Sequence, residues 1–501
     1  MVKAKGPQGK KQILYFIPEL CYFSGLNDEA TKDGTFMKLL SKETKLTPKD
    51  RIEKTNEFLH LFENNNKKDD ISLSAKEKYE KYGIEIKPIN IKQKTYYMKE
   101  TILIGKNNKI IKPRDKIFEV LEKKDFLHTK WVCFYERDNY NDADFLHKTL
   151  SKASKAYGII VEEPEWVELK KHSDENTWLK MADKYFKNNN NNNNIDNKYL
   201  FAVFLLKGNE NIYSKLKVHS LCNNGYVSQV VKVSSLHKNA MSICSKIILQ
   251  INSKISGISY EVKLVDHIKE KNLMIIGVDS SHIRGQRTGI AMVATINKNF
   301  TKFYNKETIY EEKNKEKLVF SVSSFIKEAL NVYNNELKDL PKGIIIYRQG
   351  VSLKQKDIIN QEVKNIMKEL NGKIFFYYIL VNTKANYKFF EENENNFFNP
   401  SSGLLILDGV TNKNFFEFYI QPQEVREGTA TPTCFHVAFG NLKCQEIIPK
   451  LTFDLCHLYS NWQGPVRVPH VLKAAEKLSK MTAKYTLKEL HSALAIGQSY
   501  L

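Results

Sequence analysis

The chain has 501 residues, of which 42% are hydrophobic, and its formal net charge is +20. This length leaves room for two to four domains, and this hydrophobic share is enough to bury a substantial core. The excess of basic residues favours a polyanionic partner. The chain is also rich in lysine and asparagine, so a general compositional bias explains the charge as well, and charge alone does not decide between the two.

Two further features exclude whole classes of protein. The seven cysteines contain no CxxC pair and no zinc spacing, so we expect reduced, mostly packed thiols of an intracellular protein. No apolar run reaches the length of a membrane span, and the N-terminus, MVKAKGPQGKK, has no signal-peptide core. We therefore expect a soluble protein without a membrane partner, in the cytoplasm or the nucleus. The N-terminal lysines fit a nuclear address or a solvated tail.

Residues 1–115 lack a self-contained pattern and are interpreted as a linker region that packs on a larger body. Short helices are expected over Thr35–Lys45 and Asp50–Phe62, and extended segments over Lys92–Ile104 and Lys109–Phe118.

Residues 116–262 alternate between strands and helices, which predicts a small doubly wound α/β domain. The expected strands are Trp131–Tyr135, Gly158–Val161, Tyr199–Leu206 and Gly225–Val233, and the expected helices are Ala143–Ala156, Asn211–Cys222 and Leu236–Ile255. Asn188–Asn194 is an uninterrupted asparagine run that cannot bury apolar surface, so it predicts a disordered insertion.

Residues 263–501 predict a mixed α/β layer fold. The expected strands are Leu273–Asp279, Ile290–Ile296, Ile344–Tyr347, Ile374–Val381, Leu404–Asp408 and Phe415–Ile420, the first two forming a hairpin. The expected helices are Leu318–Leu340, Lys450–Tyr459 and Val471–Lys484.

The stretch NLMIIGVD is the clearest chemical signal, because a buried apolar strand there runs into one carboxylate, Asp279. A second buried strand follows in GIIIYRQGV, Gly343–Val351. A nuclease built on paired acidic strand ends would carry an aspartate on this strand too, but the chain has Gln349. Asp279 alone therefore fits a retained structural residue better than a catalytic one.

Polar residues at helical spacing form a second candidate site. Tyr213 and Lys217 are four residues apart on one predicted helix, and Gln229 lies on the next strand. Lys246, Gln250 and Lys254 follow at intervals of four. An aromatic ring, amides and lysines on one face suit a terminal phosphate with a base stacked above it. An ordinary solvated helix face fits the same spacing, and the residues alone favour it.

Several long segments resemble the Argonaute family, in particular its Piwi branch. PTCFHVAF (Pro432–Phe439) resembles the PTHYNV-type strand of that branch, and IIIYRQGVS stands where the family has YRDGV. LTFDLCHLYSNWQGPVRVP (Leu451–Pro469) is similar to its LTYKLCHMYYNWQGxIRVP signature. NLMIIGVDSSH resembles its GIDVYH strand, and IPELCYFSGLNDEATKD the segment that leaves its PAZ domain.

The resemblance implies an organisation for the whole chain. Residues 1–115 would be the PAZ exit and second linker, residues 116–262 a Rossmann-like MID domain, and residues 263–501 an RNase H-like PIWI domain. The N-terminal and PAZ domains would be absent, either because the protein is natively short or because the chain is a truncation. The final Tyr500-Leu501 resembles family members whose terminal carboxylate inserts beside the MID pocket, which favours an intact C-terminus.

The resemblance also assigns roles to single residues. It implies that five side chains and the terminus bind the 5′ phosphate of a guide RNA: Tyr213, Lys217, Gln229, Gln250, Lys254 and Leu501. Lys246 has no assigned counterpart. A glutamine at position 250 is the Piwi-branch choice, which implies a metal ion, Mg²⁺, shared with that phosphate.

For the nuclease site the resemblance implies an Asp, Glu, Asp and His set that holds two divalent ions about 4 Å apart. Asp279 matches the first position, and the second is Glu316 or Lys317, depending on the register. Gln349 stands at the third and Glu476 at the fourth, since His470 is six residues too early. Gln349 cannot supply the charge that a metal pair requires, so a catalytic metal at Asp279 is doubtful.

These features imply a small-RNA-guided protein that binds complementary RNA without cutting it and acts in RNA silencing or processing through protein partners. The alternative is a metal-dependent, guide-directed RNA endonuclease with an atypical catalytic set. A degenerate scaffold that binds no RNA is a third hypothesis, against which the retained pocket residues speak.

Overall fold

The structure is a computed structural model. It describes residues 2–5, 11–14, 25–26, 30–31, 33–63, 75–85, 95–113, 120–121, 130–186, 199–237, 239–264, 268, 271–283, 285–311, 318–394, 396–440, 447–462, 464–485 and 489–501. The asparagine run at residues 188–194, and residues 316 and 317, lie outside this part of the chain. The described residues fall into two compact units.

The first unit comprises Met1–Pro88, Phe390–Asn399 and Val425–Thr429. Its elements are strands β1 (Val2–Lys5) and β2 (Lys11–Leu14), helices α2 (Gly34–Thr44), α3 (Pro48–Glu63) and α4 (Ala75–Glu80), and the hairpin of β16 (Glu391–Asn393) and β17 (Asn396–Phe398). Asp33 caps α2, since its side chain accepts hydrogen bonds from the backbone N–H groups of Thr35 and Phe36. The two predicted short helices are thus confirmed.

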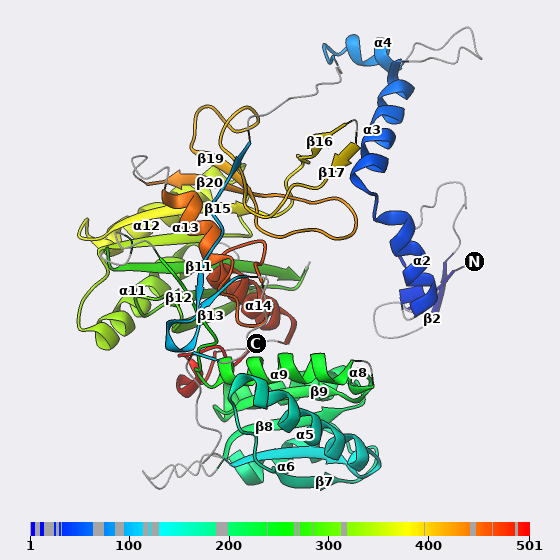
Figure 1. Ribbon diagram of the computed structural model, residues 1–501, viewed down its shortest axis with the longest axis vertical. Coiled ribbons are helices and arrows are strands. Elements are labelled where there is room, and N and C mark those ends of the chain that lie inside the picture. The colour runs from blue at the N-terminus through cyan, green and yellow to red at the C-terminus, as the bar shows by residue number, and fades with distance from the viewer. Residues whose placement is uncertain are drawn as a thin grey trace. The chain divides into compact units, whose positions relative to one another are not determined.

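The second unit contains a four-stranded, fully parallel sheet in the order β7-β6-β8-β9. Helices flank this sheet (Figure 1). The strands are β6 (Lys130–Glu136), β7 (Glu165–Leu169), β8 (Tyr199–Leu206) and β9 (Val227–Lys232). The helices are α5 (Tyr140–Ser154), α6 (Glu175–Phe186), α7 (Glu210–Val218), α8 (Val233–Leu236) and α9 (Ala240–Lys254).

The predicted alternation is confirmed here, but one of its strands is wrong. Gly158 adopts a left-handed conformation with φ of 66°, and the segment after it, in which Ile159 and Val161 are buried and Ile160 is exposed, pairs with no strand. The second strand is instead Glu165–Leu169. The helix predicted over Leu236–Ile255 is confirmed as α9, but it begins four residues later, at Ala240, because Asn239 before it has φ of 55°. α6 was not predicted.

A nine-stranded mixed sheet follows in the order β13-β12-β11-β14-β15-β20-β19-β18-β3. β14 runs parallel to β11 and β15, and the other pairings are antiparallel. The strands are β3 (Tyr96–Tyr97), β11 (Leu273–Ile283), β12 (Arg287–Thr295), β13 (Phe303–Glu311), β14 (Gly343–Arg348), β15 (Phe375–Asn382), β18 (Leu404–Ile406), β19 (Glu417–Gln421) and β20 (Thr433–Phe439). A smaller sheet pairs β10 (Glu261–Val262), β4 (Leu103–Ile104) and β5 (Ile110–Ile111).

Helices cover both faces of the large sheet. Alternate residues of β11, beginning with Met274, pack with α11 (Leu318–Leu337) and α12 (Lys356–Leu370). The intervening residues, such as Ile275, pack with α13 (Ile447–Leu455) and α14 (His470–Tyr485). Figure 1 shows these helices around the sheet. The predicted α11, α13 and α14 are confirmed, whereas α12 was not predicted. None of the described helices is long and apolar enough to span a membrane.

β11 does not end at Asp279, as the sequence suggested. It continues to Ile283 in the hairpin with β12, where Asp279 pairs with Ala291. Its parallel pairing with β14, however, stops at Val278 and Arg348. Asp279 therefore lies where β14 ends, which still places the carboxylate at an edge between two strands.

Two glycines allow α14 to lie directly on the sheet. A Cβ atom at Gly277 of β11 would overlap the backbone of Val471 and Leu472 in α14. A Cβ atom at Gly289 of β12 would stand 2.8 Å from the carbonyl oxygen of Ser479. Both conflicts involve helix backbone, which cannot rotate away as a flexible side chain would. The spacing between helix and sheet therefore depends on the absence of these side chains.

We expect Gly277→Ala to lower the free energy of unfolding by about 2 kcal/mol or more, because overpacking a rigid contact costs roughly 1–3 kcal/mol. Chemical denaturation measures this change. Gly34→Ala is the control, since nothing lies within 4 Å of a Cβ atom there, and its effect should stay within about 0.5 kcal/mol. Equal effects of the two substitutions would contradict the close helix–sheet contact.

Candidate functional site

Two lysines are buried together between α7, α9 and β9. Lys217 is 2% exposed and Lys254 is 3% exposed. The Nζ atoms of both donate to the backbone oxygen of Ser228, at 3.2 and 2.9 Å. Lys254 also donates to Oε1 of Gln229 at 2.7 Å. The structure thus joins three of the predicted pocket residues, and it does not support a solvated helix face.

A third lysine, Lys477 of α14, belongs to the same group. Burial, followed by the positive charge of Lys477, lowers the pKa of Lys217 to about 7. Burial, followed by the charges of Lys217 and Lys477, holds the pKa of Lys254 well below its usual value. Burial lowers the pKa of Lys477 itself to about 8. We call Lys217, Lys254 and Lys477 the lysine pocket.

The lysine pocket has the electrostatics of an anion site. Within the described part of the chain, none of its three ammonium groups is paired with a carboxylate. Burying like charges together is costly unless a counter-charge is supplied from outside. An anion with several acceptor oxygens would restore the lysines to their charged form and satisfy their remaining N–H groups.

Tyr213 lies beside this pocket. With Lys477, Lys480 and Lys484 it lines a cavity of about 340 Å³ between α7 and α14. Its ring meets that of Tyr485 edge to face, with centroids 5.6 Å apart. Burial, followed by the charges of Tyr485 and Glu210, raises the pKa of Tyr213 to about 12, so its hydroxyl stays neutral. The predicted aromatic platform is therefore adjacent to the cations.

The contacts of Gln250 and Leu501 do not involve the lysine pocket. The amide nitrogen of Gln250 donates to Oδ1 of Asn461, in the loop after α13. On the same helix, Lys246 lies 5.5 Å from the centre of the half-exposed Trp462 ring. Leu501 is buried, and its backbone N–H donates to the carbonyl of Gln498 at 3.1 Å. Gln250 and Lys246 thus attach α9 to the NWQG loop.

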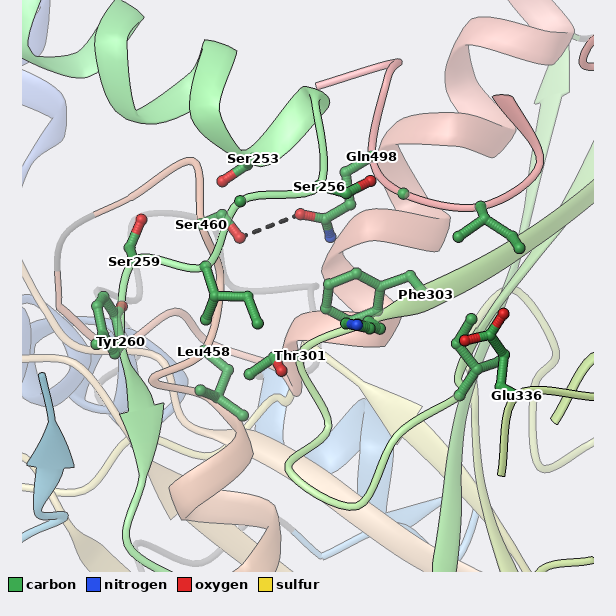
Figure 2. A pocket seen from close by; sticks show the side chains of 16 residues that line it. Ser253, Ser256, Ser259, Tyr260, Thr301, Phe303, Glu336, Leu458, Ser460 and Gln498 are labelled. Atoms are coloured by element: carbon green, nitrogen blue, oxygen red, sulfur yellow. Dashed lines mark hydrogen bonds between the residues drawn. The ribbon is translucent and has the colours of Figure 1, made fainter. Parts of the chain in front are cut away.

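The C-terminal tail is held by β13. Asn305 donates to the carbonyl oxygens of Ala495 and Gly497 at 3.0 and 2.6 Å, and the Tyr500 hydroxyl donates to Asn305 at 2.9 Å. A cavity of about 140 Å³ lies between this tail and the end of α9. Figure 2 shows the side chains that line it. Ser460 donates to Gln498 there at 3.1 Å. Its hydroxyls and its size suit a few ordered waters.

The nuclease-like residues also approach α14, at Ser479 and at Glu476, and Glu476 lines the same cavity as Tyr213 and Lys477. Asp279 is 4% exposed, and the Ser479 hydroxyl of α14 donates to its Oδ2. Burial raises the pKa of this carboxyl, while Ser479 and the nearby Arg348 oppose the shift. Arg348 itself is held by Glu362, with Nη2 at 3.0 Å from Oε1. Asp279 is therefore placed by two structural partners.

Gln349 and Glu476 both lie near Asp279, but their side chains have different partners. The backbone N–H of Gln349 donates to the Val278 carbonyl at 2.9 Å, which brings its residue beside Asp279. Its buried Oε1 has no hydrogen-bond partner in the described chain. Glu476 accepts from Lys473 at 2.8 Å and from Lys480. Burial raises the pKa of Glu476, but these two lysines outweigh it and leave the pKa below its usual value.

The described residues fit a metal pair poorly. No three of their His, Cys, Asp or Glu side chains gather closely enough to hold a metal ion. Asp279 is engaged by a hydroxyl and Glu476 by two ammonium groups, while Gln349 is neutral. His470 is fully buried and lies within hydrogen-bond distance of the carbonyl oxygens of Leu455 and Phe300, so it is structural. Glu316 and Lys317 lie outside the described residues.

The sequence analysis missed Lys477 and Ser479. A signal was present, since lysines stand at positions 473, 477, 480 and 484 along one helix. The spacing of these lysines does not by itself show which other element the helix faces.

Comparisons with known proteins identify the family of the chain. The Piwi domain family matches residues 200–486. The chain is 27% identical to Protein argonaute-3 of Drosophila melanogaster, over all of this chain and 56% of that protein. It is 26% identical to Piwi-like protein 3 of Homo sapiens, over 99% of this chain and 56% of that protein. The chain thus spans about half the length of these relatives.

Solved structures show the same fold. The crystal structure of Drosophila Piwi matches with a TM-score of 0.78 at 22% identity, over 93% of this chain and 64% of that one. Kluyveromyces polysporus Argonaute with a guide RNA matches with a TM-score of 0.67 at 15% identity, over 81% of this chain and 56% of that one. The expected mixed α/β class with an RNase H-like PIWI fold is confirmed. Because the family match covers more than half of its residues, the chain belongs to the Piwi domain family.

Proposed function

We propose that this chain binds a small guide RNA by its 5′ phosphate and pairs with complementary RNA without cutting it. The observation that carries the proposal is the lysine pocket, where three ammonium groups converge without a carboxylate partner among the described residues. A terminal phosphate supplies the missing charge, and Tyr213 stands beside it as a platform for the first base. The protein would then act in RNA silencing or processing through protein partners.

The names of structural relatives support a nucleic-acid ligand. One is an Argonaute with a guide RNA, and another, from Clostridium butyricum, is bound to a guide DNA and a target DNA. The alternative function is a metal-dependent, guide-directed RNA endonuclease. Asp279 favours it, but the neutral Gln349 and the two lysines on Glu476 weigh against it.

We also propose that one Mg²⁺ ion joins the 5′ phosphate. The amide oxygen of Gln250 remains available for a metal, because the nitrogen of the same amide donates to Asn461. The terminal carboxylate of Leu501 would add a second hard oxygen ligand of the kind that Mg²⁺ prefers. The lysine pocket already supplies positive charge, so the metal would add to the affinity for the phosphate rather than create it.

RNA with a 5′ phosphate should bind roughly tenfold or more tightly than the same strand with a 5′ hydroxyl, since a charge-assisted hydrogen bond contributes about 1.5–3 kcal/mol. Lys217→Ala and Lys254→Ala should each abolish this preference. Filter-binding titrations measure it, and EDTA should reduce it less than either substitution does.

Lys246→Ala is the matched control, because this exposed lysine lies on the same helix as Lys254 but outside the lysine pocket. It should keep the preference for the phosphate. Equal affinities of the wild-type protein for the two termini would remove the guide-binding model and leave only a basic surface.

The preference for the 5′ phosphate should weaken as the pH rises from about 7 to 9. In the free protein, Lys217 and Lys477 have pKa values of about 7 and 8, so they lose their protons over this range. The bound phosphate needs them protonated, so binding takes up protons and becomes weaker at high pH. Binding titrations with the 5′-phosphate and the 5′-hydroxyl strand across this pH range measure the preference. A ratio of affinities that stays constant with pH would contradict it.

We expect no cleavage of a fully complementary target RNA with Mg²⁺ or Mn²⁺. Gln349→Asp alone should restore little activity, because Glu476 would still be held by Lys473 and Lys480, and residues of one catalytic unit do not act additively. Gel analysis of a labelled target measures both. Specific cleavage opposite a fixed guide position, lost in Asp279→Ala, would establish the endonuclease instead.

A further inference from the structure

A separate cleft lies at the carboxyl ends of the parallel sheet. It measures about 630 Å³ and is lined from β6, β8 and the starts of α6 and α7. In the strand order β7-β6-β8-β9, the chain passes from one side of β6 to the other between β7 and β8. This is the topological switch point, where open α/β sheets form ligand crevices. We call it the strand-end cleft, and none of the lysine pocket residues lines it.

One buried polar group at the strand-end cleft has no hydrogen-bond partner among the described residues. Trp178 of α6 lines the cleft and is only 1% exposed. Its indole N–H is fully buried and finds no hydrogen-bond acceptor within the described part of the chain. Leaving such a donor unpaired costs about 1–3 kcal/mol. The cleft therefore provides for an acceptor atom that comes from outside these residues.

The charge of the strand-end cleft is opposite to that of the chain. Three carboxylates line it, those of Glu136, Asp174 and Glu175, against one lysine, Lys207. The whole chain has a net charge of +20. An RNA phosphate would be repelled from this cleft, whereas a cation would be drawn to it.

Glu136 is the best-placed carboxylate. It is 8% exposed at the end of β6, and its Oε1 accepts from the backbone N–H of Ser173 at 3.1 Å. Its Oε2 lies 3.9 Å from Nζ of Lys207, beyond hydrogen-bonding distance. Lys207 also lies 3.7 Å from Asp138, so it is shared between two carboxylates. Asp138 itself is paired with Lys171 at 2.8 Å. Because Lys207 makes no hydrogen bond to Oε2 of Glu136, a second cation with directed N–H groups can bind that oxygen.

We propose that the strand-end cleft binds an arginine side chain on a peptide segment of a protein partner. The guanidinium group would donate to Glu136, with Asp174 and Glu175 adding negative potential. A carbonyl oxygen of the same peptide would accept from the Trp178 indole. Arginine suits the cleft better than lysine, because its planar group offers several N–H donors in a fixed arrangement to a partly used carboxylate.

The test measures binding of three short peptides, acetyl-Gly-Xaa-Gly-amide with arginine, lysine or citrulline at the centre, by NMR titration of the whole chain. Citrulline has the shape of arginine without its charge. The arginine peptide should bind at least tenfold more tightly than the citrulline peptide, and the lysine peptide should bind with intermediate affinity. Equal binding of arginine and citrulline would overturn the proposal.

Variants locate the binding within the strand-end cleft. Glu136→Gln should remove the arginine preference, and Trp178→Phe should weaken all three peptides about threefold while keeping their order. Lys207→Gln should strengthen arginine binding, because it removes a competing cation. A gain in affinity cannot result from loss of folding, so it distinguishes a binding role from a structural one. Thermal denaturation checks the folding of every variant.

Two controls separate this cleft from the RNA site. Lys217→Ala should leave peptide affinity unchanged, since Lys217 belongs to the lysine pocket. A 5′-phosphorylated RNA strand should not compete with the arginine peptide. Competition by that RNA, or an unchanged arginine preference in Glu136→Gln, would show that the peptide binds elsewhere and would refute the proposal.

Discussion

The backbone contact between α14 and the hairpin of β11 and β12 is the constraint on which both candidate sites depend. Gly277 and Gly289 provide no side chain to separate helix from sheet. With that spacing, Ser479 reaches Asp279 from one part of the helix. Lys477 reaches the lysine pocket from another part, and Lys484 reaches Glu210 at the start of α7, 2.7 Å away. A single helix thus places groups at an anion site and at a nuclease-like site.

The two sites differ in how their charges are balanced. At the nuclease-like site Arg348 is paired with Glu362 and Glu476 with two lysines, while Asp279 accepts a hydrogen bond from the Ser479 hydroxyl. In the lysine pocket Lys217 and Lys254 are buried and Lys477 is partly buried, without such a partner among the described residues. A balanced site is stable without a ligand, whereas an unbalanced one is completed by binding. The distribution of charge therefore favours holding a polyanion over metal-dependent cleavage.

Much of the fold could be predicted from the sequence because its buried strands are continuous apolar runs. β8 and β14 were recognised for that reason. The strand predicted at Gly158–Val161 was wrong because an apolar run need not pair with a strand, and the left-handed Gly158 turns the chain there. For the candidate site, the resemblance to the Argonaute family assigned Lys217 and Lys254, whereas their spacing alone favoured a solvated helix face, and the structure shows them buried together. Lys477 could not be placed beside them, because it comes from an element more than 200 residues away in sequence.

The position of two residues on α14 has a thermodynamic consequence. Lys477 belongs to the lysine pocket and Ser479 donates to the Asp279 carboxylate, so both groups are carried by the same helix. If an anion shifts α14, the environment of the Asp279 proton changes with it. Linkage then requires reciprocity: protonation of Asp279 must change the affinity for the anion by the same factor by which the anion changes the acidity of Asp279. A carboxylate without a catalytic role would in this way still report on, and adjust, what the pocket holds.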